Sequence, residues 1–287
     1  MSNNLKTVGL LSLMTALVFW LGYSFGGEGG LWIGLVLAFG INFLAYFFSD
    51  KMALAASRAK PVTEEELPEV YSIVRNLTTA TGMPMPRLFL MDSPQPNAFA
   101  TGRNPEHAAV AVTTGILQIM NREELAGVLA HELSHVQNRD ILISSVAAML
   151  AAALSIFARM AMFMGGGRDE RSNPLSGIAA LLSLILAPIA AMIIRMAISR
   201  SREFQADRSG AETTGQPLQL ASALAKLEAG TSRVAMNVNP AVSQLFIADP
   251  LHAFKGRRGG GLISLLATHP AIPDRIARLQ AMANGET

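Results

Sequence analysis

The sequence predicts an α-helical integral membrane protein, with four transmembrane helices in two hairpins and a mainly α-helical α+β domain outside the bilayer. Three observations predict this class. Of 287 residues, 51% are hydrophobic and only 15% are charged, where a soluble domain usually carries about a quarter charged residues. The apolar residues gather in four long runs. The segments between the second and third runs and after the fourth carry the turn and periodicity signals of folded soluble structure.

The first hairpin is expected in residues 1–50, with spans at about 8–25 and 31–48. Each run is about as long as a helix needs to cross a hydrocarbon core of roughly 30 Å. A signal peptide is the alternative for the first run, but only Lys6 precedes it and no small-residue cleavage site follows. The turn holds a single charge, Glu28, whereas three basic residues follow the second run. By the positive-inside tendency, the soluble domain and both termini are therefore expected in the cytoplasm.

The first half of the soluble domain is expected in residues 51–140. A helix is predicted from Thr63, as N-cap, to Thr79, and another begins at Asn121 with Glu124 at the reciprocal capping position. Between these helices, three short strands are predicted at Arg87–Met91, Asn97–Ala100 and Ala108–Thr113.

The second hairpin is expected in residues 141–198, with spans at about 141–164 and 175–198, and the second half of the domain in residues 199–287. A helix is predicted at Pro217–Glu228 and a last amphipathic helix at Ile272–Met282. The stretch from Gly230 to Gly261 has little periodicity and is interpreted as a long, partly mobile loop.

The predicted helix after Asn121 contains the pattern His131-Glu132-x-x-His135. Two histidines four residues apart on a helix share one face and can bind one Zn²⁺, and Glu132 is placed to hold a water beside it. A chance match on an amphipathic helix has a probability on the order of one per cent in a chain of this length. The chain has no cysteine, so any metal must be held by His, Asp or Glu.

A catalytic zinc usually has three protein ligands and one open position, so a third ligand is needed. We expect Glu203, because the second hairpin would return the chain to the membrane face from which it left. Asp207 lies one helical turn further and is expected to hydrogen-bond a ligand. The alternative is that these residues form a solvated face beside the membrane. The other candidate ligands in the sequence are His107, His252 and His269.

These parts predict peptide hydrolysis, with Glu132 as the base that takes a proton from the attacking water. His269 and Arg275 are candidates to stabilise the tetrahedral intermediate; a simple helix start with its salt bridge is the alternative for both. The strand Asn97, Ala98, Phe99, Ala100 offers an edge to an extended peptide, unless it is an interior strand.

The joint pattern resembles the HtpX-type membrane zinc endopeptidases, bacterial relatives of the CAAX prenyl endopeptidases. The resemblance covers nearly the whole chain and rests on the histidine motif with Asn138-Arg139-Asp140 after it, Glu203-Phe-Gln-Ala-Asp207, Asn97-Ala-Phe-Ala-Thr-Gly102, Thr268-His269-Pro270 and Arg275-Ile276. It implies a zincin-like metalloprotease domain with one Zn²⁺ per subunit on His131, His135 and Glu203. It further implies Glu132 as general base, Asp207 behind the ligands, and His269 and Arg275 near the scissile bond.

The resemblance also implies a place and a role. The protein would act in the bacterial cytoplasmic membrane, in stress response and quality control. Its substrates would be polypeptides, chiefly damaged membrane proteins cut at the cytoplasmic face. No feature specifies an oligomeric state, and a net charge of +2 without a basic run argues against a nucleic-acid partner.

Two rival functions are less well supported by the sequence. In an intramembrane protease the histidine motif would lie within a span, but charged residues bracket it here. In a metal transporter or scaffold, polar ligands would be expected within the spans, which have almost none. We also expect the stretch Gly230–Gly261 or the Asn97 strand to cover part of the cleft.

Overall fold

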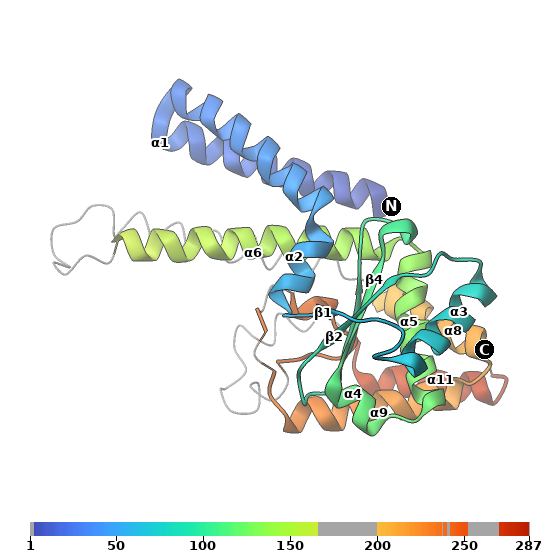
Figure 1. The fold of residues 1–287 in the computed structure, drawn as a ribbon. Helices are drawn as coiled ribbons and strands as arrows, with labels where there is room; N and C mark the ends of the chain where they lie inside the picture. The colour runs from blue at the N-terminus through green and yellow to red at the C-terminus, as the bar shows by residue number, and fades with distance from the viewer. Residues whose placement is uncertain (1–2, 166–199, 237, 240–241, 252–269, 287) are drawn as a thin grey trace.

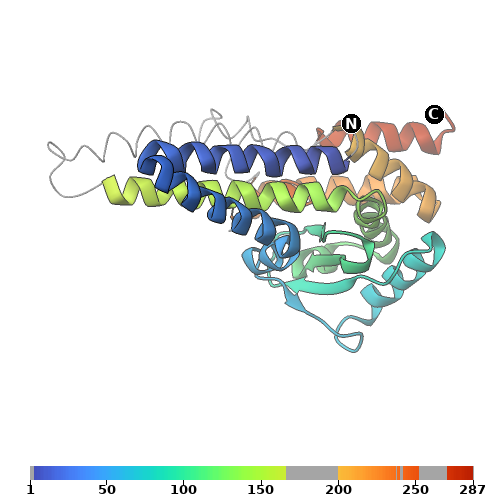
Figure 2. The same ribbon diagram turned by 90° about the horizontal axis from the view of Figure 1, so that it is seen from above.

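The computed structural model describes residues 3–165, 200–236, 238–239, 242–251 and 270–286. The helices α1 (Asn3–Phe47) and α6 (Asp140–Gly165) project on the same side of a domain built around a small mixed sheet (Figures 1 and 2). The two helices contact each other along the first arm of α1. This division matches the predicted separation of membrane helices from a soluble domain.

Helix α1 is a hairpin of two arms that reverses at Gly27, where φ is 55° and ψ is −140°. Only glycine adopts this conformation readily, so the turn predicted in residues 26–30 is confirmed. The two arms are in close contact at Gly22 and Gly30. A Cβ on either glycine would collide with the backbone of the other glycine, on the opposite arm. Both arms, Leu5–Tyr23 and Gly27–Phe47, are long and apolar enough to cross a membrane.

The outer surface of the hairpin is apolar. Large hydrophobic side chains such as Trp32, Val36 and Phe39 are about two-thirds to three-quarters exposed, at 66%, 72% and 74%. A soluble protein rarely exposes so continuous an apolar surface, which favours contact with lipid.

The sheet has the strand order β1-β2-β4-β3, with β2 (Arg87–Met91) parallel to β4 (Ala109–Thr113). Strand β3 (Ala98–Thr101) pairs antiparallel with β4 and lies at one edge; β1 (Lys60–Pro61), which the sequence analysis did not predict, lies at the other. The three predicted strands are thus confirmed within a residue at each end. The 3-10 helix η1 (Pro105–His107) connects β3 to β4.

The two faces of the sheet serve two hydrophobic cores. Ala98, Val110 and Val112 join the core beneath α3 (Pro68–Thr81), α5 (Arg122–Gln137) and α9 (Pro217–Arg233), while Phe99 and Ala111 join the core at the base of α1 and α6. The alternation follows from the two-residue period of a strand. The sheet therefore fixes the apolar helices α1 and α6 to the domain that carries the histidine motif.

Shorter elements complete the described parts of the chain: α2 (Ser49–Ala56), α4 (Thr114–Ile119), α8 (Arg200–Thr214), the 3-10 helix η2 (Ser243–Leu245) and α11 (Ile272–Ala283). Helix α11 confirms the last predicted helix. Helix α6 coincides with the third apolar run, whereas the fourth run, at 175–198, lies outside the described residues.

The structure corrects two boundaries. Helix α3 begins at Pro68 rather than after Thr63, because a residue before proline disfavours the helical region and Pro68 suits the first helical position. Helix α9 continues past Glu228 to Arg233. It passes through Gly230, where a Cβ would collide with the ring of Pro96.

In the stretch from Gly230 to Gly261, which is predicted as a long and partly mobile loop, the described residues 242–251 pack into the domain. Val242, Phe246 and Ile247 are buried, and Ile247 N–H donates to Ala98 O at 3.0 Å. The segment lacks a helical or strand period because it is held by single contacts with β3, which leave no repeating pattern in its sequence.

Candidate metal centre

Helix α5 carries His131, Glu132 and His135 into the centre of the domain. The predicted capping box is present: Asn121 Oδ1 accepts from Glu124 N–H at 2.8 Å, and Glu124 Oε2 accepts from Asn121 N–H at 3.0 Å. His131 and Glu132 are almost fully buried. The imidazoles of His131 and His135 lie edge to face, with ring centroids 4.8 Å apart.

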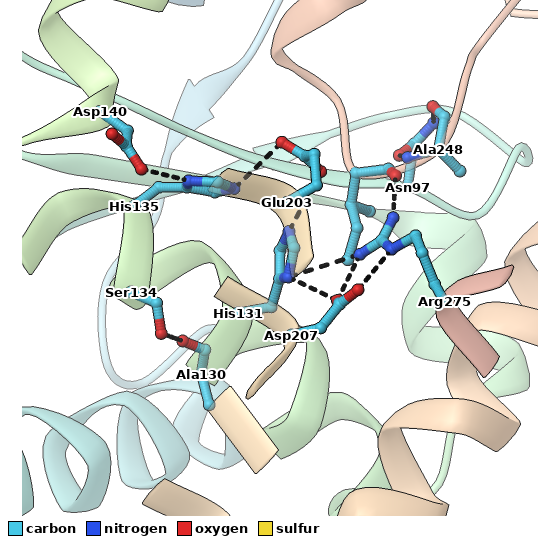
Figure 3. A network of polar contacts seen from close by, with 11 residues as sticks. Asn97, Ala130, His131, Ser134, His135, Asp140, Glu203, Asp207, Ala248 and Arg275 are labelled. Carbon is cyan, nitrogen blue, oxygen red and sulfur yellow. Dashed lines mark hydrogen bonds and ion pairs between the residues drawn. The ribbon is translucent and has the colours of Figure 1, made fainter. Parts of the chain in front are cut away.

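Helix α8 brings a carboxylate to the same point. Gly210 allows this close approach, because a Cβ there would lie 2.9 Å from His131 N. The carboxylate oxygens of Glu203 lie 3.8 Å from His131 Nε2 and 3.5 Å from His135 Nε2. One ligand atom from each of the three residues falls within 4.8 Å of the others, a separation suited to one divalent ion (Figure 3). The sequence analysis expected this grouping.

The opposite nitrogen of each imidazole is held by a carboxylate. His131 Nδ1 lies 2.9 Å from Asp207 Oδ1, and His135 Nδ1 lies 3.1 Å from Asp140 Oδ2 (Figure 3). With Nδ1 held by a carboxylate, Nε2 is the nitrogen of each imidazole that faces Glu203 and can bind a metal once it is deprotonated. This is the usual outer arrangement around a metal-binding histidine.

The sequence analysis did not predict that Asp140 contacts His135, although Asp140 follows the histidine motif closely in the sequence. The signal available in the sequence was an acidic residue five positions after the second histidine, just past the helix end. Because Arg139 turns the chain there with a φ of 57°, Asp140 begins α6 and faces back toward α5.

Arg275 does not line the centre. Its guanidinium is fully buried and donates to both oxygens of Asp207, at 2.8 and 2.6 Å, and to the carbonyl of Ile247 at 3.2 Å. Its Nη2 also lies 3.4 Å from His131 Nδ1, so Arg275 contacts both Asp207 and a histidine of the centre. This placement suits a residue that orients Asp207 and His131, while a role of Arg275 beside the scissile bond stays a prediction. His269, the other candidate for that role, lies outside the described residues, as does His252.

Burial and neighbouring charges set the protonation of the centre in the absence of a metal. Burial lowers the pKa of His131 to about 4, so its imidazole is neutral. Burial also opposes the charge on His135, but Asp140 and Glu203 outweigh it and raise the pKa to about 9. Burial raises the pKa of Glu132 to about 8, and the charge of Glu203 adds to this effect. A divalent cation would have to displace the proton on His135.

The two histidines, Glu132 and Glu203 line a cavity of about 40 Å³, enough for about two or three water molecules. Ala100 of β3 lines it too, and its backbone lowers the pKa of Glu132 in opposition to burial. The opposite wall comes from residues 244–247. One of these, Gln244, is a residue that the sequence analysis missed: it is buried, and neither its amide oxygen nor its nitrogen has a partner among the described residues.

Strand β3 is an edge strand, as the predicted substrate-binding role requires, but its edge is not free along its length. Phe246 bridges Phe99, and Asn97 Nδ2 donates to Ala248 O at 2.8 Å. Asn97, Ala98 and Phe99 are consequently fully buried. Of the four predicted residues, only Ala100 borders the metal cavity.

Comparison with known proteins agrees with this geometry. The model of peptidase family M48 matches residues 64–283, which include α5, α8 and α11. The chain belongs to peptidase family M48. Over 290 residues it is 51% identical to a protein named Protease HtpX homolog from Ralstonia nicotianae, covering 100% of this chain and 99% of that protein.

Other relatives with the same name come from Ralstonia pickettii, at 51% identity, and Burkholderia multivorans, at 50%; each match covers 99% of this chain and 98% of the relative. The fold is similar to the crystal structure of S. mikatae Ste24p, with a TM-score of 0.51 at 19% identity, covering 96% of this chain and 64% of that chain. The predicted resemblance is confirmed, and this M48 member is a metalloprotease.

Replacing Glu203 by alanine is expected to remove the third ligand, so that metal bound after dialysis falls from about one ion per chain to well below that. The measurement is metal analysis of the purified chain. Glu212→Ala, which removes an exposed carboxylate from the same helix, should leave the metal content unchanged. Normal metal content in Glu203→Ala would mean that another residue completes the site.

Replacing Arg275 by glutamine should lower metal affinity about 10–100-fold, the usual effect of losing an outer partner. Because Asp207 would be left buried without its cation, the free energy of unfolding should also fall by about 3–5 kcal/mol. Competitive titration with a chelating indicator and denaturant unfolding measure the two effects. Arg278→Gln, which removes an exposed cation from the same helix, is the control; equal metal affinity in both variants would rule out the orienting role.

Proposed function

We propose that this M48 metalloprotease is a zinc-dependent endopeptidase of the bacterial cytoplasmic membrane. We further propose that it cuts damaged or misassembled membrane proteins at the cytoplasmic face, in proteolytic quality control and stress response. One observation carries the proposal: the metal-binding helix α5 is followed after only two residues by the apolar helix α6. The proposed hydrolytic centre on α5 is therefore joined by a very short connection to a helix that we propose lies in the membrane.

Zinc suits the donor set. Two imidazole nitrogens and one carboxylate are the ligands of many catalytic zinc sites, and thiolates are absent from the whole sequence. When bound, Zn²⁺ supplies a Lewis acid that lowers the pKa of a water and polarises a carbonyl. The residues that would hold it are His131, His135 and Glu203, one ion per subunit.

Glu132 is proposed as the general base. Its carboxylate borders the cavity between the histidines and β3, next to the position where an ion and its water would lie. It would take a proton from the attacking water and deliver it to the nitrogen of the leaving amine. Ala100 of β3 borders the same cavity, so Glu132 lies beside the strand edge where a peptide would lie.

An extended substrate would pair with the part of β3 that remains uncovered, at Ala100. The opposite wall offers Gln244, whose carboxamide has one donor and one acceptor group, as a peptide bond has. We propose that Gln244 hydrogen-bonds the substrate backbone across the cavity from Ala100. Pairing through backbone groups suits a protease that cuts many damaged proteins rather than one sequence.

The proposed topology has four transmembrane helices, with the domain and both termini in the cytoplasm. The two arms of α1 are long and apolar enough for two of these spans. The 26-residue α6, which coincides with the third apolar run of the sequence, is proposed as the third. Residues 175–198 are proposed as the fourth, because the chain must return to the domain to place Glu203 beside His131. The basic residues after the second span support the cytoplasmic side.

Glutamine at position 132 is expected to keep zinc but to lower the rate of casein or membrane-protein cleavage by about 10²–10⁴-fold, the usual contribution of a general base. The assay uses the purified full-length chain in detergent, with product mapping and metal analysis. Glu123→Gln, an exposed change on the same helix, should cleave normally. Cleavage by Glu132→Gln at the control rate would exclude the proposed mechanism.

Replacing Gln244 by methionine, which has a similar shape, should lower kcat/KM at least about tenfold without loss of zinc. The same change should keep or raise the melting temperature, because a buried amide without partners costs about 1–3 kcal/mol. Steady-state kinetics and thermal unfolding measure both effects, with the exposed Gln118→Met as control. Unchanged kinetics would show that Gln244 does not contact the substrate.

A further inference from the structure

We propose that a second site on this protein binds the headgroup of an anionic phospholipid. The site is a cavity of about 520 Å³ where the domain-side ends of the α1 arms meet the soluble domain. Leu11 and Phe47 form its wall on the hairpin, and Arg103, Asn104, Arg139 and Leu142 form its wall on the domain. It shares no lining residue with the metal cavity.

The cavity is positively charged. Two guanidinium groups line it, and no carboxylate is among its lining residues. Arg103 lies 2.7 Å from His107 Nε2 and 5.6 Å from the centre of the Phe47 ring, and neither contact neutralises its charge. Neither arginine forms a salt bridge within the described parts of the chain. Arg87, by contrast, has its charge paired, because it forms a salt bridge with Asp50 at 2.6 Å.

The backbone supports a role for the Arg139 side chain. This residue adopts a φ of 57°, a left-handed conformation that costs a residue with a Cβ roughly 1–2 kcal/mol. Glycine or asparagine would adopt it more easily. The turn alone therefore does not account for arginine here, whereas binding an anion at this cavity does.

The apolar half of the cavity distinguishes a lipid from a soluble anion. Val8 and Phe47 line it and are also exposed, at 58% and 42%, so the wall continues into the apolar outer surface of α1. A phosphate at the arginines would have its acyl chains against that surface. Basic pockets between transmembrane helices at the cytoplasmic side suit such headgroups. The lipid would join the hairpin to the domain and so help to fix the height of the metal centre above the membrane.

This inference rests on the proposed membrane location of α1. The experiment below distinguishes a wrong lipid site from a wrong membrane location. The full-length Glu132→Gln chain, which should not cut itself, is purified in detergent and titrated with phosphatidylglycerol or phosphatidylcholine of the same acyl chains. Native mass spectrometry counts bound lipids. We expect one phosphatidylglycerol to bind at least about tenfold more tightly than phosphatidylcholine.

The variant Arg103→Gln/Arg139→Asn should lose most of this preference, at least about tenfold, since each basic residue near a headgroup strengthens binding several-fold. Asparagine at position 139 keeps the left-handed turn. The matched control, Arg75→Gln/Arg122→Gln, removes two exposed arginines from the α3 and α5 surface and should bind as the parent does. Metal content and melting temperature verify that each variant is folded.

Four results would overturn the inference. Equal retention of phosphatidylglycerol by the variant and the control would mean that the arginines do not form the site. Binding of glycerol 3-phosphate as tight as that of the lipid would identify a soluble phosphate ligand instead. If the chain stays soluble without detergent, the membrane location itself is wrong. If the parent chain shows no lipid preference while the wild-type chain cleaves its substrates normally, only the lipid site is wrong.

Discussion

The contact between Asp207 and His131 is the interaction on which the rest of the centre depends. Asp207 accepts from Arg275 through both oxygens, and this pairing lowers the pKa of its carboxyl well below the usual range, although burial acts in the opposite direction. The same guanidinium donates to Ile247 O. One buried carboxylate thereby links α5, α8, α11 and the segment beside β3, four parts of the chain that are distant in sequence (Figure 3).

Such a network is stable only if complete, because a buried charge without its partner is costly. Asp207 has Arg275, and Asp140 lies beside both His135 and Arg202, whose Nε is 3.6 Å from its carboxylate. Each histidine is thus fixed in orientation before any metal arrives. The site is therefore preorganised, because both imidazoles already point toward the position where an ion would bind. Helix α5 packs closely against α8 at this point, which Gly210 permits.

Much of this architecture could be predicted from the sequence, and the failures have physical causes. The hairpin, the capped helix and the grouping of His131, His135 and Glu203 follow from periodicity, glycine and motif spacing. The sequence did not decide between two roles for Arg275, because an arginine beside the scissile bond and an arginine behind Asp207 occupy the same sequence position on an amphipathic helix. The segment 242–251 was missed because contacts such as Asn97 with Ala248 are made across about 150 residues and leave no local pattern.

The junction between α5 and α6 explains why the metal centre and the membrane attachment are inseparable. A straight continuation of α5 would carry Asp140 away from His135; the left-handed Arg139 breaks the helix and turns Asp140 back to the imidazole at 3.1 Å. The same turn sets the direction in which α6 leaves the domain. Any movement of α6 relative to α5 must therefore act on the residue that orients His135. A rigid junction keeps the ligands aligned whatever surrounds the apolar helices. Arg139 lies at this junction, between the metal centre and the cavity beside α1.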